Sequence, residues 1–271
     1  MTDVSTTPSR TFVFDLDGVV YLGGEGVPGA GETLRTLDAR GDQILFATNN
    51  SSRALSTVVR HIAERTGYDP DPASVITSGM AAAHLLGDHE TCLVLGSTEL
   101  EATLAAEGIT ITEDPYAATT LVVGLDRRLS YERLTAAVLA VDNGARFIAT
   151  NDDATFPMPG ARHPGGGAIV AAVERATGVE ALVCGKPHPP MRRLIEERIV
   201  NDDVWMVGDR PDTDLAFAAA AGWGKILVLT GVADGADGLP DDLTPDYTLP
   251  SIAELAELAE LVTRQSPAVR R

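Results

Sequence analysis

The sequence has little cysteine, few aromatic side chains and little positive charge, and each shortage excludes a class of protein. Cys92 and Cys184 lie far apart, without the spacing of zinc ligands or of a disulfide framework. Aromatic content is 5%, which with abundant alanine favours helix-rich α/β packing over an all-β sandwich. Lys and Arg number 21 against 39 Asp and Glu, a net charge of −18 that repels nucleic acid and anionic membranes. An anionic substrate must therefore meet a local positive site or a metal ion.

Long hydrophobic runs are also missing. No stretch approaches the ~20 apolar residues that span a bilayer, and the first ten residues lack the apolar segment of a secretory signal. We therefore expect a cytoplasmic protein, with no membrane or nucleic-acid partner and with reduced thiols. The 271 residues, 44% of them hydrophobic, are enough for one large domain or two smaller ones.

Short apolar runs alternate with helical patterns along the chain. Predicted strands at Thr11 to Asp15, Gln43 to Thr48 and Val204 to Val207 are each followed by a loop and a helix. This alternation predicts an α/β fold with a parallel sheet and crossover helices. A second series of the same kind covers residues 91–150, and periodicity leaves open whether it extends one sheet or forms an inserted domain. The proline-containing segment before the predicted helix Ala168 to Thr177 is expected to be a loop.

Polar residues gather just after four of the predicted strands. They are Asp15 with Asp17, Thr48 with Asn49, Lys186, and Asp209 with Asp214. In a parallel sheet these positions are the carboxyl ends of the strands, where α/β proteins bind ligands. Carboxylates there suit Mg²⁺, a lysine offsets phosphate charge, and a threonine with helix N-terminal amides suits phosphate oxygens. One carboxylate can also attack phosphorus and form an aspartyl phosphate.

Each of these clusters has a plain structural reading when it is taken alone. Thr48 and Asn49 can cap the following helix, and Lys186 before a proline suits a solvated loop. The later aspartates suit helix caps, and the first pair suits a solvated strand end before a glycine turn. Four such clusters in this order, each after a predicted strand, favour a common phosphate chemistry instead.

The four clusters resemble the ordered motifs of the haloacid dehalogenase (HAD) superfamily of phosphohydrolases. They read Asp15-Leu16-Asp17-Gly18-Val19, Thr48-Asn49-Asn50-Ser51, Gly185-Lys186-Pro187 and Gly208-Asp209-Arg210-Pro211-Asp212-Thr213-Asp214. The runs Val123–Arg127 and Phe147–Asn151 narrow the resemblance to the NagD-like branch, subfamily IIA, which includes nitrophenylphosphatases. This resemblance implies a Rossmann-like parallel-sheet core at residues 1–84 and 181–271. It also implies an inserted α/β C2-type cap at residues 85–180.

The resemblance implies a Mg²⁺-dependent phosphatase that hydrolyses a small phosphomonoester through an aspartyl phosphate. Asp15 is then the nucleophile, and Asp17 protonates the leaving alcohol and afterwards activates water. Mg²⁺ is held by the Asp15 side chain, the Asp17 carbonyl and Asp209. Asp214 orients Lys186 or a metal-bound water.

The same resemblance assigns the remaining site residues. Thr48 and Asn49 bind the phosphoryl group, and Lys186 stabilises charge around it. In the cap, the candidate substrate contacts are Asn151, Asp153 and His163, although His163 suits a solvated loop equally well. The family often has proline between the asparagine and the aspartate, where this chain has Asp152.

Other functions on the same fold stay open at this point. A non-catalytic protein that binds a phosphate ligand has no need of a general acid such as Asp17, and a phosphotransferase would share the phosphoenzyme. The partner we expect is a small phosphorylated metabolite: a nucleotide, glycerol phosphate, phosphoglycolate or sugar phosphate. A homodimer formed through the cap is a family-level expectation.

Overall fold

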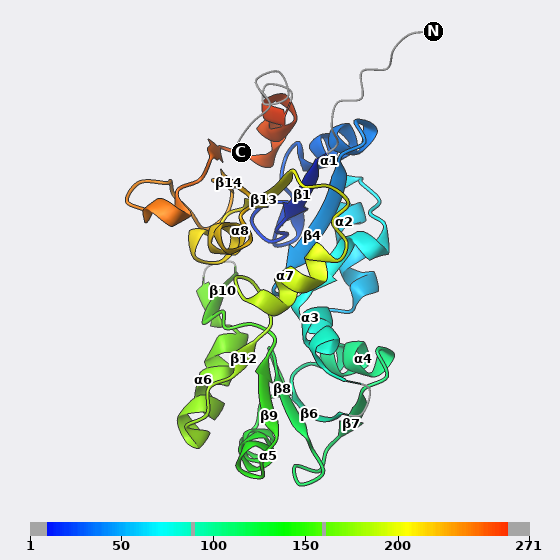
Figure 1. Ribbon diagram of the computed structural model, residues 1–271, viewed down its shortest axis with the longest axis vertical. Coiled ribbons are helices and arrows are strands. Elements are labelled where there is room, and N and C mark those ends of the chain that lie inside the picture. Colours follow the sequence, from blue (N-terminus) through cyan, green and yellow to red (C-terminus); the bar gives the residue numbers. More distant parts are fainter. Residues whose placement is uncertain (1–9, 88–89, 159–160, 260–271) are drawn as a thin grey trace. The chain divides into compact units, whose positions relative to one another are not determined.

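The computed structural model describes residues 10–87, 90–158 and 161–259 (Figure 1). These residues form two compact units. The first unit contains the described residues up to Phe46, Val59–Ser74 and those from Ile199 on, and the second contains Ala47–Val58 and Val75–Arg198. In the ranges described, no helix combines the length and the apolar character needed to cross a bilayer.

The first unit is built on parallel strands. They are β1 (Thr11–Phe14), β4 (Gln43–Thr48), β13 (Val204–Gly208), β14 (Gly224–Val228) and β15 (Tyr247–Leu249). The strands of this unit have the order β15-β14-β13-β1-β4, and the last two residues of β4 belong to the second unit. β1 lies between β13 and β4, with Phe14 aligned to Val207 and to Phe46. Buried on both faces, β1 has no polar alternation, as the apolar run predicted.

Five further elements lie in this part of the chain. They are β2 (Tyr21–Leu22), β3 (Glu25–Gly26), α1 (Ala30–Ala39), α2 (Leu55–Thr66) and α8 (Ala216–Ala221). The first turn of α2 belongs to the second unit. Three 3₁₀ turns lie at Pro72–Ser74, Asp241–Leu243 and Ile252–Glu254. A π-helical turn at Pro211–Leu215 leads directly into α8.

The second unit has a five-stranded parallel sheet of its own, in the order β12-β9-β8-β6-β7. Its strands are β6 (Thr91–Leu95), β7 (Thr110–Thr112), β8 (Thr120–Val123), β9 (Arg146–Ala149) and β12 (Leu182–Val183). The other elements are β5 (Val75–Thr77), α3 (Ser78–Leu85), α4 (Thr98–Ala106), α5 (Tyr131–Asp142), α6 (Gly166–Thr177) and α7 (Pro189–Glu196). The second series thus forms a separate sheet, and the α/β class with parallel sheets is confirmed. The cap limits at residues 85 and 180 stay a prediction.

Alternate residues of the second sheet form the core of this unit. Leu93 and Leu95 on β6 and Leu121 and Val123 on β8 have the spacing of side chains on one face of a strand. They pack with buried residues of two helices, namely Ala137 and Ala140 of α5 and Ile169, Val170 and Val173 of α6. This packing fixes the strand ends from which the polar loops leave.

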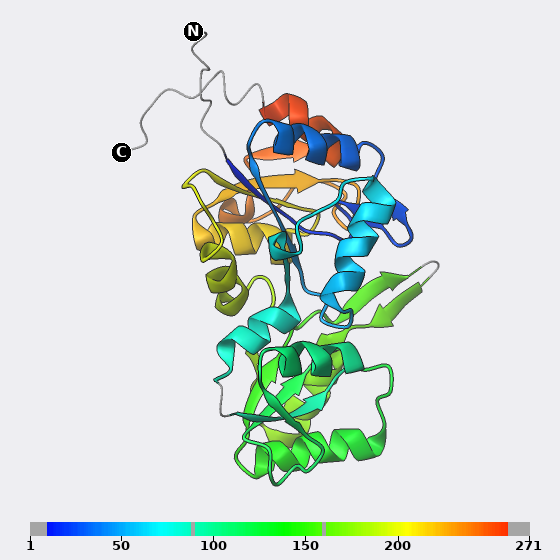
Figure 2. The same ribbon diagram turned by 90° about the vertical axis from the view of Figure 1, so that its right-hand side faces the viewer.

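The segment before α6 differs from the expected loop. It forms an antiparallel hairpin of β10 (Thr155–Met158) and β11 (Ala161–Pro164), whose paired arrows are visible in Figure 2. Phe156 lies opposite His163 in the register, with 5.8 Å between ring centroids. The expectation failed because prolines argue against a central strand, whereas both strands of a two-stranded hairpin are edges that tolerate them.

Candidate active site

The chain turns sharply where β1 ends. The N–H of Asp15 donates to the carbonyl of Val207 at 2.9 Å, which continues the pairing of the strand by one residue. Gly18 adopts a φ of 95°, a conformation that favours glycine, and its N–H donates to the Tyr21 carbonyl at 2.8 Å. As a result the Asp15 residue is 9% exposed, whereas Asp17 is exposed to solvent.

Three predicted site residues of the first unit meet at this turn. Three carboxylate oxygens lie within 4.8 Å of one another, one each from Asp15, Asp209 and Asp214. Asp209 and Asp214 are each 1% exposed. Ionised carboxylates repel one another strongly when water is excluded, and a divalent cation with oxygen ligands relieves that repulsion. The Asp17 side chain is not part of this group, which we call the carboxylate cluster.

Asp214 shapes the loop that carries Asp209. Its Oδ2 accepts the backbone N–H of Asp209 at 3.2 Å and that of Arg210 at 3.1 Å. The π-helical turn begins immediately afterwards, at Pro211. Arg210 turns to the exposed Asp212, with 2.8 Å between Nη2 and Oδ2. Asp214 therefore holds the backbone from which the Asp209 side chain projects.

Glycines leave room for the two buried carboxylates. A Cβ at Gly18 would lie 2.4 Å from Oδ2 of Asp209, and one at Gly231 would lie 1.8 Å from the same atom. A Cβ at Gly208 would lie 2.2 Å from the Cβ of Asp214. Any side chain at these positions would displace a carboxylate of the cluster.

The loop after β14 contributes contacts that sequence reasoning did not assign. The N–H of Val232 donates to Oδ2 of Asp209 at 2.7 Å, and the Thr230 hydroxyl donates to the Gly18 carbonyl at 2.6 Å. The available signal was that Thr230 and Gly231 follow another apolar strand, as the other motifs do. The donor set of hard carboxylate oxygens, held at fixed positions by backbone groups, fits a divalent cation such as Mg²⁺.

In the second unit, the Asn49 carboxamide is bonded to the backbone of Lys186. Asn49 Oδ1 accepts the Lys186 N–H at 2.7 Å, and Asn49 Nδ2 donates to the Lys186 carbonyl at 3.0 Å. A Cβ at Gly185 would lie 2.6 Å from Asn49 Oδ1, so glycine is needed beside this contact. Lys186 itself is 2% exposed. The solvated-loop reading of Lys186 is thus wrong, since tertiary contacts bury the loop.

Asn151 and Asp153 join the same network. Asn151 Nδ2 donates to the Asn49 carbonyl at 2.8 Å, and Asn49 Nδ2 donates to Asp153 Oδ2 at 3.2 Å. The Ser78 hydroxyl also donates to the Asn49 carbonyl, at 2.7 Å. Asn151 is 5% exposed, so this side chain serves the loop around Asn49.

The structure also locates two predicted site residues, Thr48 and His163, and the departure from the family pattern at Asp152. Thr48 is 3% exposed, and its Oγ1 accepts the N–H of Asn50 at 3.1 Å. Asp152, where the sequence departs from the family pattern, pairs with His188 at 3.0 Å. His163 lies on β11, exposed except for its contact with Phe156.

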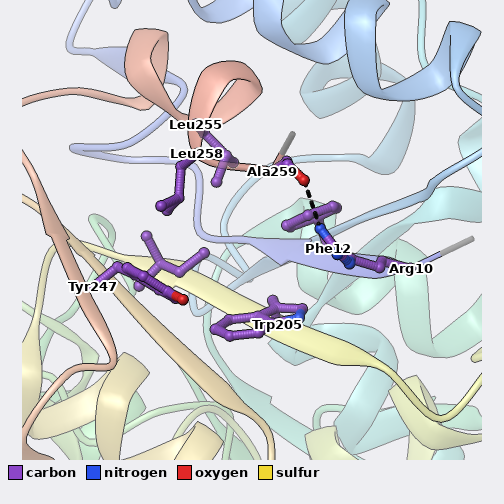
Figure 3. Close-up of a pocket in the computed structure, with 8 residues that line it drawn as sticks. Arg10, Phe12, Trp205, Tyr247, Leu255, Leu258 and Ala259 are labelled. Atoms are coloured by element: carbon purple, nitrogen blue, oxygen red, sulfur yellow. Dashed lines mark hydrogen bonds between the residues drawn. The ribbon is translucent and has the colours of Figure 1, made fainter. Parts of the chain in front are cut away.

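Two other features of the molecule carry no comparable chemistry. Burial raises the pKa of the Cys92 and Cys184 thiols to about 12, which keeps both neutral. An apolar pocket in the first unit is lined by residues that include Phe12, Trp205 and Tyr247 (Figure 3). It lies by the amino ends of the strands, whereas the carboxylate cluster lies at their carboxyl ends.

Comparison with known proteins matches this chain to one family along almost its whole length. A haloacid dehalogenase-like hydrolase model matches residues 12–110, and a second HAD-like hydrolase model matches residues 183–255. An acid sugar phosphatase of Staphylococcus aureus (strain USA300) is 34% identical over 255 residues, covering 92% of this chain and 98% of that protein.

Two solved structures extend the match to three dimensions. A glycerol phosphate phosphatase from Mycobacterium tuberculosis, in complex with magnesium, is 32% identical over 93% of this chain and 79% of that chain, with a TM-score of 0.84. A 4-nitrophenylphosphatase from Thermotoga maritima is 32% identical over 93% and 98% of the two chains, with a TM-score of 0.83. The chain therefore belongs to the haloacid dehalogenase-like hydrolase family, in its NagD-like and nitrophenylphosphatase-like branch.

Proposed function

We propose that this protein is a Mg²⁺-dependent phosphatase that hydrolyses a small phosphomonoester through an aspartyl phosphate on Asp15. The observation that carries the proposal is the buried carboxylate cluster of Asp15, Asp209 and Asp214 at the end of β1 and β13. Relatives named as acid sugar phosphatase, glycerol phosphate phosphatase and 4-nitrophenylphosphatase support the same reaction class.

The carboxylates of Asp15 and Asp209, with the carbonyl of Asp17, are the groups we assign to Mg²⁺. When it is bound, Mg²⁺ offsets the negative charge of these carboxylates and of the phosphoryl oxygens. The structure of a relative solved with magnesium supports the choice of ion. We assign Asp214 to holding the backbone of Asp209 and Arg210, whose N–H groups its Oδ2 accepts, rather than to the metal ion.

The chain's own residues then carry the proton and the phosphoryl group. A carboxylate oxygen of Asp15 attacks phosphorus, and the bond from phosphorus to the leaving oxygen breaks. Asp17 gives its proton to that oxygen, so the product leaves as a neutral alcohol. Asp17 then takes a proton from a water molecule that attacks the phosphoryl group, and Asp15 is released as a carboxylate. The exposure of Asp17 suits this exchange with substrate and water.

We assign the second unit's polar residues to the phosphoryl oxygens. Buried Lys186 is the local positive charge that the strongly acidic chain requires for an anionic substrate. The Thr48 hydroxyl accepts one N–H and keeps its own proton to donate. The Asn49 side chain is committed to the Lys186 backbone, so its proposed phosphate contact is the backbone N–H.

The substrate-contacting part of the proposal is the cap at residues 85–180. Asp153 and His163 remain its candidate contacts, while Asn151 is better assigned to holding Asn49. Sugar phosphates and glycerol phosphate are the first substrates to test, followed by nucleotides and phosphoglycolate. A homodimer and a cytoplasmic location stay predictions.

The test is release of inorganic phosphate from these four ester classes and from nitrophenyl phosphate, with Mg²⁺ and with chelator. We expect Mg²⁺-dependent release that Asp15→Asn abolishes. The matched control is Asp212→Asn, a neighbouring exposed carboxylate, and it should keep wild-type turnover. Thermal stabilisation by esters without phosphate release would contradict the proposal and favour a binding protein. Transfer to an added alcohol exceeding release to water would favour a phosphotransferase.

A further inference from the structure

A ring of hydrogen bonds surrounds Lys186 in the second unit. On one side, the Asn49 carboxamide bonds both polar groups of the Lys186 backbone, at 2.7 Å and 3.0 Å. Asn49 Nδ2 also donates to Asp153 Oδ2 at 3.2 Å. This side connects the loop of Asn151 to Asp153 with the loop that carries Lys186.

A second contact connects the same two loops on the other side of Lys186. Nε2 of His188 lies 3.0 Å from Oδ2 of Asp152. The His188 N–H donates to the Gly185 carbonyl at 2.8 Å, which closes the turn around Lys186. These contacts therefore form a closed path, which we call the lysine ring. It runs from Asn49 through Lys186, His188, Asp152 and Asp153 and back to Asn49.

The Asp152–His188 pair adds little to the core. The side chains of Asp152 and His188 are 47% and 33% exposed, and exposed pairs of this kind contribute little to folding stability. The pair does restrict where the loop on either side of Lys186 can move. A flexible lysine side chain delivers its charge accurately only when its backbone is fixed.

We propose that Asp152 and His188 are positioning residues that fix the Lys186 ammonium group for phosphoryl transfer. This inference rests on the proposed function, and it adds two residues that the family motifs do not include. With a proton on Nε2, the His188 ring donates a hydrogen bond to Asp152 Oδ2.

The chain offers a matched control for this pair. His84 Nε2 lies 3.2 Å from Glu197 Oε1, with side-chain exposures of 45% and 58%. This pair has the same chemistry, connects α3 to the end of α7, and lies in the same unit. It makes no contact in the lysine ring, so its removal should leave turnover unchanged.

The experiment is a double-mutant cycle on the full-length protein. Asp152→Ala, His188→Ala and the double variant are compared with His84→Ala, Glu197→Ala and their double variant. The readouts are kcat and KM for nitrophenyl phosphate with Mg²⁺, together with Tm. We expect each ring variant to lose about five-fold in kcat/KM, the size expected for one hydrogen bond. The loss should fall on kcat, and the double variant should lose no more than either single one.

A conservative variant that recovers activity distinguishes a positioning role from a purely structural one. Asp152→Asn keeps an oxygen acceptor for His188 Nε2–H, so it should restore kcat/KM to within about two-fold of wild type. The control cycle should stay within about two-fold throughout. Wild-type kcat in folded Asp152→Ala and His188→Ala would overturn the inference. So would losses that multiply in the double variant, or a fall in Tm alone.

Failure of the proposed function has a different signature. In that case the wild type releases no phosphate from any ester, and the same cycle is read in the affinity for inorganic phosphate with Mg²⁺ by calorimetry. A coupled loss of phosphate affinity in the ring variants, absent from the control cycle, supports the inference. Equal affinity in all variants overturns it.

Discussion

The carboxylate cluster of the first unit and the lysine ring of the second unit hold their polar groups in opposite ways. In the cluster, three like charges meet within 4.8 Å, supported by backbone N–H groups and by glycines that leave space. In the ring, amide donors and acceptors satisfy one another across three loops. The cluster therefore calls for a cation and reacting groups, whereas the ring is a scaffold that presents one lysine.

The largest expected effect is on kcat, in a variant that distinguishes the proposed role of Asp17 from that of Asp15. Asp17→Asn keeps the shape of the turn but removes the proton donor, so kcat for an alkyl phosphate should fall by roughly 10²–10⁴-fold. For nitrophenyl phosphate the first burst of nitrophenolate should keep nearly its wild-type rate, because nitrophenolate leaves without a proton, while the turnover that follows is slow because hydrolysis of the phosphoenzyme also needs Asp17. The measurement is the single-turnover rate of leaving-group release for the two esters in variant and wild type, and equal falls for both esters would contradict the role of Asp17.

The next effect tests whether the cluster depends on space left by glycine. Gly231→Ala would bring a Cβ to 1.8 Å from Asp209 Oδ2 and must displace that carboxylate. We expect about 10²-fold lower kcat and a higher Mg²⁺ concentration at half-maximal rate, because small displacements of a site are costly. Gly235→Ala is the control, since a Cβ there meets nothing within 4 Å. Equal behaviour of the two variants would refute the steric account.

A smaller effect tests the ring itself. Asn49→Ala removes both bonds to the Lys186 backbone and leaves two polar groups to be satisfied elsewhere. We expect the free energy of unfolding to fall by about 1–3 kcal/mol, which lowers Tm by several degrees, with a clear loss of kcat. Asn143→Ala is the control, because that exposed side chain makes only a 3.4 Å bond to the Tyr116 carbonyl. An unchanged Tm and kcat in Asn49→Ala would show that the ring is not needed.

The smallest expected effect is on the reactivity of the Cys184 thiol, which is next to the lysine ring in sequence and can report on that loop. Burial raises the pKa of both thiols to about 12, so the thiolate fraction rises with pH between 7 and 9 yet stays minute. A thiol reagent should therefore leave the folded protein unmodified and active. In Asn49→Ala, Cys184 should react faster while Cys92 is unchanged, as peptide mapping of the labelled protein would show. If the modification rates of Cys184 and Cys92 change by the same factor relative to wild type, the loop beside Lys186 did not loosen.

The sequence predicted the cluster better than the ring, for a physical reason. Asp15 and Asp209 follow parallel strands, and the carboxyl ends of neighbouring strands meet at one edge whatever the loops do. The bond from Lys186 to Asn49 spans 137 positions, and that from His188 to Asp152 spans 36. No local sequence pattern encodes such pairs, and motifs at strand ends do not predict them.

Two other features of the structure could not be predicted from the sequence, for related reasons. The hairpin of β10 and β11 carries prolines that read as loop signals, and only its isolation from a larger sheet makes them tolerable. A side chain at Gly231 would clash with Asp209, which approaches from another loop, and the sequence around Gly231 does not predict this contact. The roles of individual site residues, Asp15 included, stay predictions that the experiments above address.

The most direct test of the central claim is to identify the residue that carries the phosphoryl group. The protein is quenched in acid during turnover of nitrophenyl phosphate with Mg²⁺, reduced with borohydride and mapped by mass spectrometry. An acyl phosphate is reduced to an alcohol, so we predict homoserine at position 15, in larger amount in Asp17→Asn, whose phosphoenzyme breaks down slowly. Steady turnover with Asp15 unmodified, or reduction at another carboxylate, would contradict the account.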